Sequence, residues 1–426
     1  MGGWGMGLGV ACLAIAVSMA AWVPANGQTC NPECLRQEQC QNCNRGPCCV
    51  RAGDQRPLVS TPSSTTPAIR IGLVAPITGP SALSVGQQIV AGAKLFVAVH
   101  DTPVSGKRIE LLIKDTGGDP ARAKATTQEL IQRDRAAVIA IVGSGPASAI
   151  ISDATEAKVP ILLMANGTST ITQRSPYFVR SSFTYFQAAK AISDWAIRNN
   201  IRNVVTVVSD STFGAEVQAS FKSTFGEAGG NVVTEIKVPL NSQDLASVLN
   251  VATNARPHAI IAFVPSFQLT NLMQHVAALG AAAAEMKLIG GLNEITDDDL
   301  IGVPHSVLTN TVTAHFYSVD GNSEANRAFV AAFARENAKM PNSLAVEGYD
   351  AMRLIYAALQ NTRGDTNGDR LINAMSGAWE SPRGPMSIDP QTRDVTQNMY
   401  MRGMERRDGR LSNVPIATFE SIRASR

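Results

Sequence analysis

From residue 69 onward, short apolar runs alternate with longer segments in which apolar residues recur every three or four positions. The short runs predict buried strands and the longer segments predict amphipathic helices. Strands are expected at 69–76, 109–114, 138–142, 160–164, 204–208, 232–238 and 259–264. Helices are expected at 86–100, 120–133, 147–157, 188–198, 215–227, 244–254, 269–279, 323–338 and 344–360. Strands and helices that alternate in this way build parallel sheets with helices on both faces.

The alternation runs twice along the chain, and a crossing segment at 177–184 separates the two series. We therefore expect an α/β fold of two Rossmann-like lobes, each built on its own parallel sheet. The last two predicted helices cannot all fit on the second sheet, so we expect the chain to cross back between the lobes. The predicted lobe boundaries are 69–186 with 314–390 for the first lobe, and 187–313 with 391–420 for the second.

The N-terminus is an export signal rather than part of the fold. Residues 6–23 form an apolar run, and Ala25 and Gly27 are the small residues that signal peptidase requires before a cut at Gln28. We expect residues 1–27 to be removed, which places the mature protein in the periplasm or outside the cell. Because no Lys or Arg precedes the run, an uncleaved membrane anchor is the alternative.

A cysteine-rich segment follows at 28–50. It holds six cysteines, and the chain beyond it has none: Cys30, Cys34, Cys40, Cys43, Cys48 and Cys49. An even number of cysteines after an export signal predicts disulfides, although the spacing does not decide which cysteines pair. The alternative is a metal site, because Cys40 and Cys43 have chelate spacing. Residues 51–68 are rich in Pro, Ser and Thr, a composition typical of a linker.

Composition and motifs argue against several functions. The net charge of +2 lacks the basic excess that nucleic-acid binding needs, so we expect no nucleic-acid partner. The chain has no G-x-S-x-G elbow, no H-E-x-x-H helix and no Walker loop, and its five histidines share no spacing. We therefore expect a binding protein without catalytic residues, cofactor or metal.

Small polar residues follow the third and fourth predicted strands, where open parallel sheets bind their ligands. A Gly-Ser-Gly turn precedes a helix after the third strand, and an Asn-Gly-Thr-Ser turn follows the fourth. Backbone N–H groups and hydroxyls at such turns suit a carboxylate. The candidates are Ser144, Gly145, Ser148, Asn166, Gly167, Thr168 and Ser169. The alternatives are plain turns without a ligand and a dinucleotide site, which would lack its ribose-binding acid.

In the second half, four residues that follow predicted strands are further candidates: Phe213, Ser266, Asn293 and Glu294. Phe213 could present an aromatic ring to the ligand. Glu294 is the nearest carboxylate for a ligand ammonium group, and an N-cap role is an equal alternative.

Several stretches, taken together, resemble the type I periplasmic binding proteins of the branched-chain amino acid group. They are IGLVAPITG at 71–79, DTGGDPA at 115–121, SDATEAKVP at 152–160, DSTFG at 210–214, EGYDA at 347–351 and GPMSIDPQTRD at 384–394. The resemblance implies two lobes joined by three crossovers that close on a ligand. It also implies the receptor of an ABC importer, which passes a small carboxylate such as a branched-chain amino acid to a membrane permease.

The resemblance assigns the ligand carboxylate to the turn at 144–148, where Ser144 is favoured over Gly145 and Ser148, and to the turn at 166–169. It assigns the aromatic position to Phe213. The place of the acid that holds the ligand amino group falls on Leu292–Glu294 and departs from the family pattern. Aromatic or keto acids are therefore an alternative ligand class, which the SPRGP segment at 381–385 also favours. A sensory ligand-binding module is a second alternative, because the same fold serves both roles.

Overall fold

The computed structural model describes residues 28–30, 49–51, 67–79, 82–242, 245–278, 287–293, 295, 303–407 and 410–425. The chain separates into two units, residues 1–65 and residues 66–426, which are described one after the other. Among the described helices, none combines the length and apolarity needed to cross a bilayer.

The first unit contains one short antiparallel ribbon. Strands β1 (Gln28–Cys30) and β2 (Cys49–Arg51) pair so that the backbone of Cys30 lies opposite that of Cys49. The other four cysteines of the segment lie outside the described residues, as do the predicted signal peptide and nearly all of the linker. The predicted disulfides and cleavage site therefore stay predictions.

The second unit contains two sheets, and the first sheet is parallel throughout, with the strand order β4–β3–β5–β6–β7. Its strands are β3 (Ala68–Ala75), β4 (Arg108–Asp115), β5 (Val138–Val142), β6 (Ile161–Met164) and β7 (Phe178–Arg180). Alternate residues face opposite sides, so Ile71 and Leu73 enter one apolar core and Val74 enters another. Both faces of this sheet are therefore covered.

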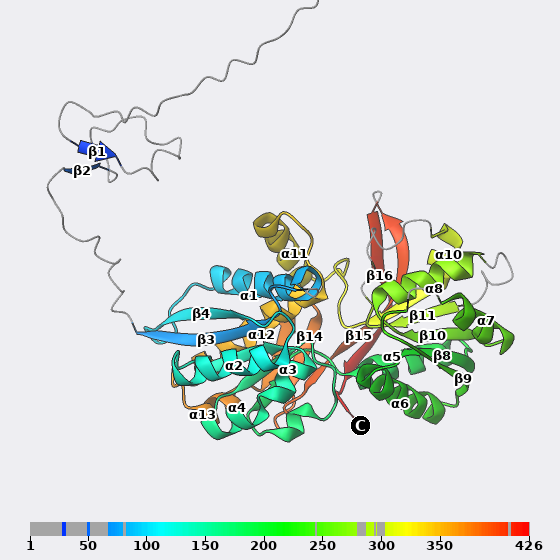
Figure 1. Cartoon of the computed structure of the whole chain (residues 1–426), viewed down its shortest axis with the longest axis horizontal. Coiled ribbons are helices and arrows are strands. Elements are labelled where there is room, and N and C mark those ends of the chain that lie inside the picture. Colours follow the sequence, from blue (N-terminus) through cyan, green and yellow to red (C-terminus); the bar gives the residue numbers. More distant parts are fainter. Residues whose placement is uncertain are drawn as a thin grey trace, which may run out of the picture. The chain divides into compact units, whose positions relative to one another are not determined.

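Helices cover the two faces of the first sheet (Figure 1). One group comprises α1 (Gln87–Val99), α12 (Ser343–Asn361) and α13 (Gly368–Ala374), and α11 (Glu324–Asn337) packs against α1 rather than on the sheet. The other comprises α2 (Pro120–Gln132), α3 (Ser144–Ala149) and α4 (Ile151–Ala157). The backbones of α1 and α12 are in close contact, because a Cβ at Gly348 would lie 2.0 Å from the Ile89 carbonyl oxygen. Glycine at this position allows the helix to approach.

The second sheet has a parallel part with the order β9–β8–β10–β11–β12. These strands are β8 (Asn203–Ser209), β9 (Asn231–Val238), β10 (Ala259–Phe263), β11 (Lys287–Gly291) and β12 (Thr311–His315). The helices around it are α5 (Tyr185–Arg198), α6 (Thr212–Glu227), α7 (Ala246–Asn254), α8 (Ser266–Ala278) and α10 (His305–Asn310). Phe221 of α6 and Leu272 of α8 belong to separate cores, so this sheet is also covered on both faces.

Antiparallel strands at the C-terminal end extend the second sheet, and the sequence did not predict them. They are β13 (Gly377–Ser381), β14 (Gly384–Ile388), β15 (Val395–Arg407) and β16 (Arg410–Ile422). The start of β15 pairs with β14, and its later residues pair with β12 and β16. Val395 packs in the core of the first lobe, whereas Met399 and Met401 pack in the core of the second. Strand β15 therefore passes from one lobe to the other (Figure 1).

Three connections thus join the lobes: residues 181–184 between β7 and α5, residues 316–323 between β12 and α11, and strand β15.

The predicted α/β class with two parallel sheets is confirmed. Four predicted helix starts were wrong by three residues: those expected at 147, 188, 215 and 269 lie at Ser144, Tyr185, Thr212 and Ser266. Helix α5 begins at Tyr185 rather than at 188, because Thr184 and Gln187 form a capping box. The helix expected at 147–157 begins earlier, at Ser144, and is interrupted at Ile150.

Candidate functional site

The first candidate residues lie at the ends of two neighbouring strands. Val142 of β5 and Met164 of β6 are register partners, so the residues that follow them emerge side by side. The Ser144 hydroxyl donates to Asn166 Oδ1 at 3.1 Å, and the Thr168 hydroxyl donates to Ser144 Oγ at 3.2 Å. The Thr168 N–H also donates to Asn166 Oδ1, at 3.2 Å. The two predicted turns therefore meet in one hydrogen-bonded group.

The remaining candidates of the first turn are placed differently from the expectation. Ser144 is the first residue of α3 rather than part of a loop before it, because the chain turns at Gly143 with a φ of 92°. Gly145 and Ser148 are exposed on the same short helix. In the second turn, Ser169 is half-buried beside Thr168.

Tyr185, the first residue of α5, packs directly on the second turn. Its N–H donates to the Gly167 carbonyl at 3.0 Å, and a Cβ at Gly167 would lie 2.2 Å from the ring. Only glycine leaves space for the tyrosine at this position. The Tyr185 hydroxyl lies beside Ser144, and burial and then the nearby Glu216 raise its pKa to about 12. The phenol is therefore neutral at physiological pH.

Helix α6 contributes Phe213 and Glu216 from the second lobe. The helix begins where Ser211 caps it by accepting a hydrogen bond from the Gly214 N–H. The Phe213 ring meets the Tyr185 ring edge-on, with centroids 4.9 Å apart. Glu216 lies one turn further along α6, beside the Thr168 side chain of the first lobe. The first lobe and the second lobe therefore contact each other through these side chains.

The electrostatics of Glu216 reflect its surroundings. Burial raises the pKa of its carboxyl group, and the nearby Thr168 hydroxyl and the charge of Arg180 only partly offset that effect. Within the part of the chain that the structure describes, Glu216 Oε2 has no hydrogen-bond partner. We refer to Ser144, Asn166, Thr168, Tyr185 and Glu216 as the strand-end cluster. All except Asn166 are only half-buried, although Glu216 Oε2 itself is buried.

The buried Arg180 side chain holds the backbone of the strand-end cluster in place. Arg180 donates to the carbonyl oxygens of Asn166 at 3.2 Å and Thr168 at 2.6 Å, and also to that of Phe183. Its charge is balanced by Asp394, with Nε and Oδ1 2.8 Å apart. Burial lowers the pKa of Arg180, and the attraction of Asp394 opposes this change. The backbone that carries the hydroxyls is thus held rigidly.

A second buried group holds the start of the same turn. The Ala165 N–H donates to Glu347 Oε2 of helix α12 at 2.6 Å, and Ala165 has a φ of 46°. Burial raises the pKa of Glu347 to about 7. The carboxyl group fixes a residue in a backbone conformation that alanine rarely adopts.

The candidates of the second lobe have other partners. Asn293 Nδ2 donates to the Val264 carbonyl at 2.8 Å, and the Asn293 carbonyl accepts from Arg402, so this residue ties strand ends together. Ser266 begins α8 at a half-buried position. Glu294 lies outside the described residues.

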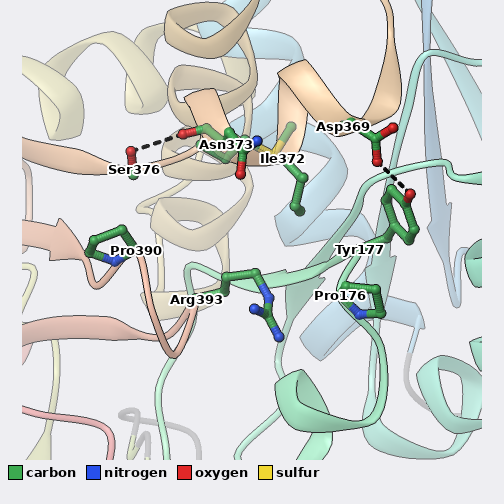
Figure 2. A pocket seen from close by; sticks show the side chains of 9 residues that line it. Pro176, Tyr177, Asp369, Ile372, Asn373, Ser376, Pro390 and Arg393 are labelled. Carbon is green, nitrogen blue, oxygen red and sulfur yellow. Dashed lines mark hydrogen bonds between the residues drawn. The ribbon is translucent and has the colours of Figure 1, made fainter.

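A separate cavity of about 250 Å³ lies in the first lobe (Figure 2). It is lined by Pro176, Tyr177, Asp369, Ile372, Asn373, Met375, Ser376, Pro390 and Arg393. Figure 2 shows the Tyr177 hydroxyl donating to Asp369 Oδ1, at 2.5 Å. The Arg393 guanidinium donates to the backbone carbonyls of Phe178 and Thr172. These polar groups already have partners, so we assign no ligand to this cavity. No three potential metal ligands come together in the described part of the chain.

A protein-family model described as "Periplasmic binding protein" matches residues 68–410, which are nearly all of the second unit. The chain belongs to this family. The predicted family resemblance is therefore confirmed, and the chain is the solute-binding component of an ABC transporter, a class that acts outside the cytoplasm. The periplasmic binding proteins are receptors rather than enzymes.

Two kinds of relative stand out. The Leu/Ile/Val-binding protein homolog 6 of Brucella abortus is 33% identical over 360 residues, covering 83% of this chain and 92% of the relative. A solute-binding protein of Rhodopseudomonas palustris BisB5, solved with 3,4-dihydroxybenzoic acid, is 44% identical with a TM-score of 0.75. The match covers 83% of this chain and 98% of that one. Another R. palustris solute-binding protein, solved with 4-hydroxybenzoate, is 33% identical with a TM-score of 0.76, covering 83% and 97%.

Sequence reasoning missed Tyr185, Glu216, Arg180 and Glu347. Glu216 lies three residues after Phe213 on the same helix, and i,i+3 residues share a face, so this spacing could have identified it. Glu347 contacts a residue 182 positions away, which no local pattern reveals.

Proposed function

We propose that this chain is the receptor of an ABC importer and that it binds a small carboxylate at the strand-end cluster. The supporting observation is that the Thr168 hydroxyl donates to Ser144 Oγ in the first lobe, and that these two side chains lie beside Tyr185 and Glu216 at the edge of the second. A ligand carboxylate that took over these hydroxyl donors would contact both lobes at once. Such a ligand binds the closed state better than the open state and shifts the population toward closure. The closed form would then engage the membrane permease.

Within the carboxylates, we favour an aromatic acid that carries a ring hydroxyl. The Tyr185 and Phe213 rings meet edge-on beside the cluster, and the ring centroid of Phe183 lies 6.1 Å from that of Tyr185. These aromatic side chains could pack against the ring of an aromatic ligand. A phenolic hydroxyl could donate to the unpartnered Oε2 of Glu216. The two R. palustris relatives were solved with hydroxylated benzoic acids, which supports the same ligand class.

A branched-chain amino acid is the second candidate, and Glu216 is also the observation that favours it. The carboxylate would pair with the ligand ammonium group, the role that sequence reasoning gave to Glu294. The name of the Brucella relative supports this class. The two candidates differ in what they require of Glu216: a ring hydroxyl needs a hydrogen-bond acceptor, whose contribution is largest when it is charged, whereas an ammonium group needs a negative partner in order to bind.

Calorimetric titration of the protein with 3,4-dihydroxybenzoate, 4-hydroxybenzoate, benzoate and leucine separates the candidates. We expect 4-hydroxybenzoate to bind roughly tenfold more tightly than benzoate, because a hydrogen bond to a charged group contributes about 1.5 kcal/mol or more. Leucine should bind more weakly than any of these acids. The Glu216→Gln variant should lose most of the preference for the ring hydroxyl and still bind benzoate.

Other outcomes have defined meanings. Leucine binding that exceeds that of every aromatic acid, and that is lost in Glu216→Gln, would establish the amino acid candidate instead. Failure of all these compounds and of a wider panel of carboxylates to bind would contradict the proposed ligand class.

A further inference from the structure

Arg383 lies in the turn between β13 and β14, within the SPRGP segment, and its side chain is fully buried. Ser381 Oγ accepts a hydrogen bond from the Arg383 N–H at 3.0 Å, which shapes the turn. The hydroxyl of Tyr400 donates to the Arg383 carbonyl. Both the backbone and the guanidinium are therefore held in a defined position.

The guanidinium contacts all three connections between the lobes. It donates to the carbonyl oxygens of Ser181 at 2.6 Å and Ser182 at 3.2 Å in the first connection. It lies 5.1 Å from the ring centroid of Phe316 in the second connection. It also donates to Gln397 Oε1 at 3.1 Å in strand β15, the third connection.

The remaining contact anchors this group to the first lobe. Arg383 Nε lies 2.8 Å from Asp350 Oδ2 on α12, and Ser381 Oγ donates to the same oxygen at 2.7 Å. Neither side chain of the Arg383–Asp350 pair is exposed to solvent. A buried ion pair usually adds no more stability than apolar side chains of the same volume. Stability alone therefore does not account for a charge at the meeting point of three connections.

We propose that Arg383 is the positioning residue of the hinge. It fixes the first-lobe ends of the three connections to α12, so that bending during lobe closure is confined to the segments beyond it. Arginine suits this role because its planar fork presents five donors in fixed directions, which lysine cannot reproduce. The inference rests on the lobe closure proposed above, but not on the identity of the ligand.

The test measures the distance between the lobes without any ligand. Spectroscopic labels are attached through unnatural amino acids at Lys124 on α2 and Lys222 on α6, both exposed, because the segment at 28–50 contains the native cysteines. We expect Arg383→Lys to broaden the interlobe distance distribution of the ligand-free protein. It should also weaken ligand binding roughly tenfold by faster dissociation.

Arg393→Lys is the matched control. Arg393 donates to the carbonyls of Phe178, Thr172 and Ser175, all within the first lobe. We expect this variant to lose thermal stability and to keep the interlobe distribution of the wild type. If Arg383→Lys fails to fold, Gln397→Leu removes the contact of Arg383 to β15, together with the hydrogen bonds that Gln397 donates to Ser182 and Gln187, and should broaden the distribution in the same direction.

The outcomes are separable from those of the binding proposal. An unchanged distribution in the folded Arg383→Lys variant, or an equal broadening in Arg393→Lys, would overturn the hinge role whatever the ligand is. A broadened distribution supports it even if no compound of the carboxylate panel binds, a result that would count against the binding proposal alone.

Discussion

Hydroxyl groups, rather than permanent positive charges, make up the donors of the strand-end cluster. The Thr168 hydroxyl donates to Ser144 Oγ, and the Tyr185 hydroxyl lies beside Ser144. The nearest cation, Arg180, is occupied by backbone carbonyls and by Asp394. A carboxylate at this site would therefore be stabilised by hydrogen bonds and not by an ion pair. Because hydrogen bonds are directional, such a site selects ligands by the position of their acceptor atoms more than by their charge.

Removal of two of these hydroxyls should weaken binding without unfolding the protein. We expect Ser144→Ala with Thr168→Ala to cost roughly 1.5–3 kcal/mol of binding free energy for each hydrogen bond that the charged ligand loses. Calorimetry with the tightest-binding acid of the panel measures the loss. Circular dichroism should show an unchanged fold, because both side chains are half-buried and solvent can satisfy what remains.

Ser148→Ala is the control for this pair. It removes a hydroxyl from the same helix, α3, at an exposed position. Affinity should stay within about twofold of the wild type, less than 0.5 kcal/mol. If Ser148→Ala weakens binding as much as the double variant does, the ligand lies on α3 itself rather than between the lobes.

At the scale of elements, helices α1 and α12 pack backbone against backbone. A Cβ at Gly348 would lie 2.0 Å from the Ile89 carbonyl, and one at Gly92 would lie 1.8 Å from the Ala345 carbonyl. Helix α12 also carries Glu347 and Asp350, which hold the turn before the cluster and Arg383. The position of α12 therefore affects the site and the hinge together.

Gly348→Ala should destabilise the protein by roughly 1–3 kcal/mol, the usual cost of overpacking a core, because neither helix backbone can give way locally. Chemical denaturation measures the change. Gly226→Ala in α6 is the matched control, because a Cβ there meets nothing within 4 Å. That variant should be neutral or more stable by up to about 1 kcal/mol, as expected from helix propensity. An equal loss of free energy of unfolding in the two variants would show that the close packing of α1 and α12 does not cause the destabilisation by Gly348→Ala.

Strands whose residues are all apolar and buried were the ones that the sequence predicted most directly. All residues of β5 and β10 are buried, and their apolar runs indicated strands directly. Strand β15 was missed because buried and half-exposed positions are mixed along it and because the buried Arg402 interrupts its apolar residues. Its arginine is stabilised by the distant carbonyls of Tyr317 and Asn293, which the sequence around it does not reveal.

The same distinction applies to the candidate site. Ser144, Asn166 and Thr168 were predicted because neighbouring parallel strands end at the same edge, a rule that needs only local sequence. Tyr185 was not, because its contact with Gly167 depends on the path of the first connection between the lobes. Asn293 was proposed for the ligand, but its amide donates to the Val264 carbonyl.

For the molecule as a whole, a buried carboxyl group links folding to pH. Burial raises the pKa of Glu347 from 4.5 to about 7, while Arg383 opposes and Asp350 reinforces the shift. The folded state therefore binds a proton more tightly than the unfolded state does. The resulting stabilisation is fully present below about pH 4.5 and is lost as the pH rises to about 7.

Glu347→Gln should remove this dependence, because glutamine stays neutral and can still accept the Ala165 N–H. We expect the variant to match the wild type near pH 5 and to exceed its free energy of unfolding near pH 8 by an amount on the order of a few kcal/mol. Urea denaturation at both values tests this. Glu336→Gln on the surface of α11 should give a curve parallel to the wild type. If the free energy of unfolding of Glu347→Gln instead changed with pH in parallel with that of the wild type, the Glu347 carboxyl group would be charged in the folded protein at both pH values.

The path of β15 has a consequence for how the protein is made. Val395 completes the core of the first lobe, and Met399 and Met401 complete that of the second, so both cores wait for the final tenth of the chain. A nascent polypeptide leaving the ribosome cannot finish either half early, unlike a tandem of independent domains. Synthesis in this order keeps the growing chain incompletely folded until it is nearly complete. An unfolded chain is the form that passes most easily through a narrow membrane channel during export.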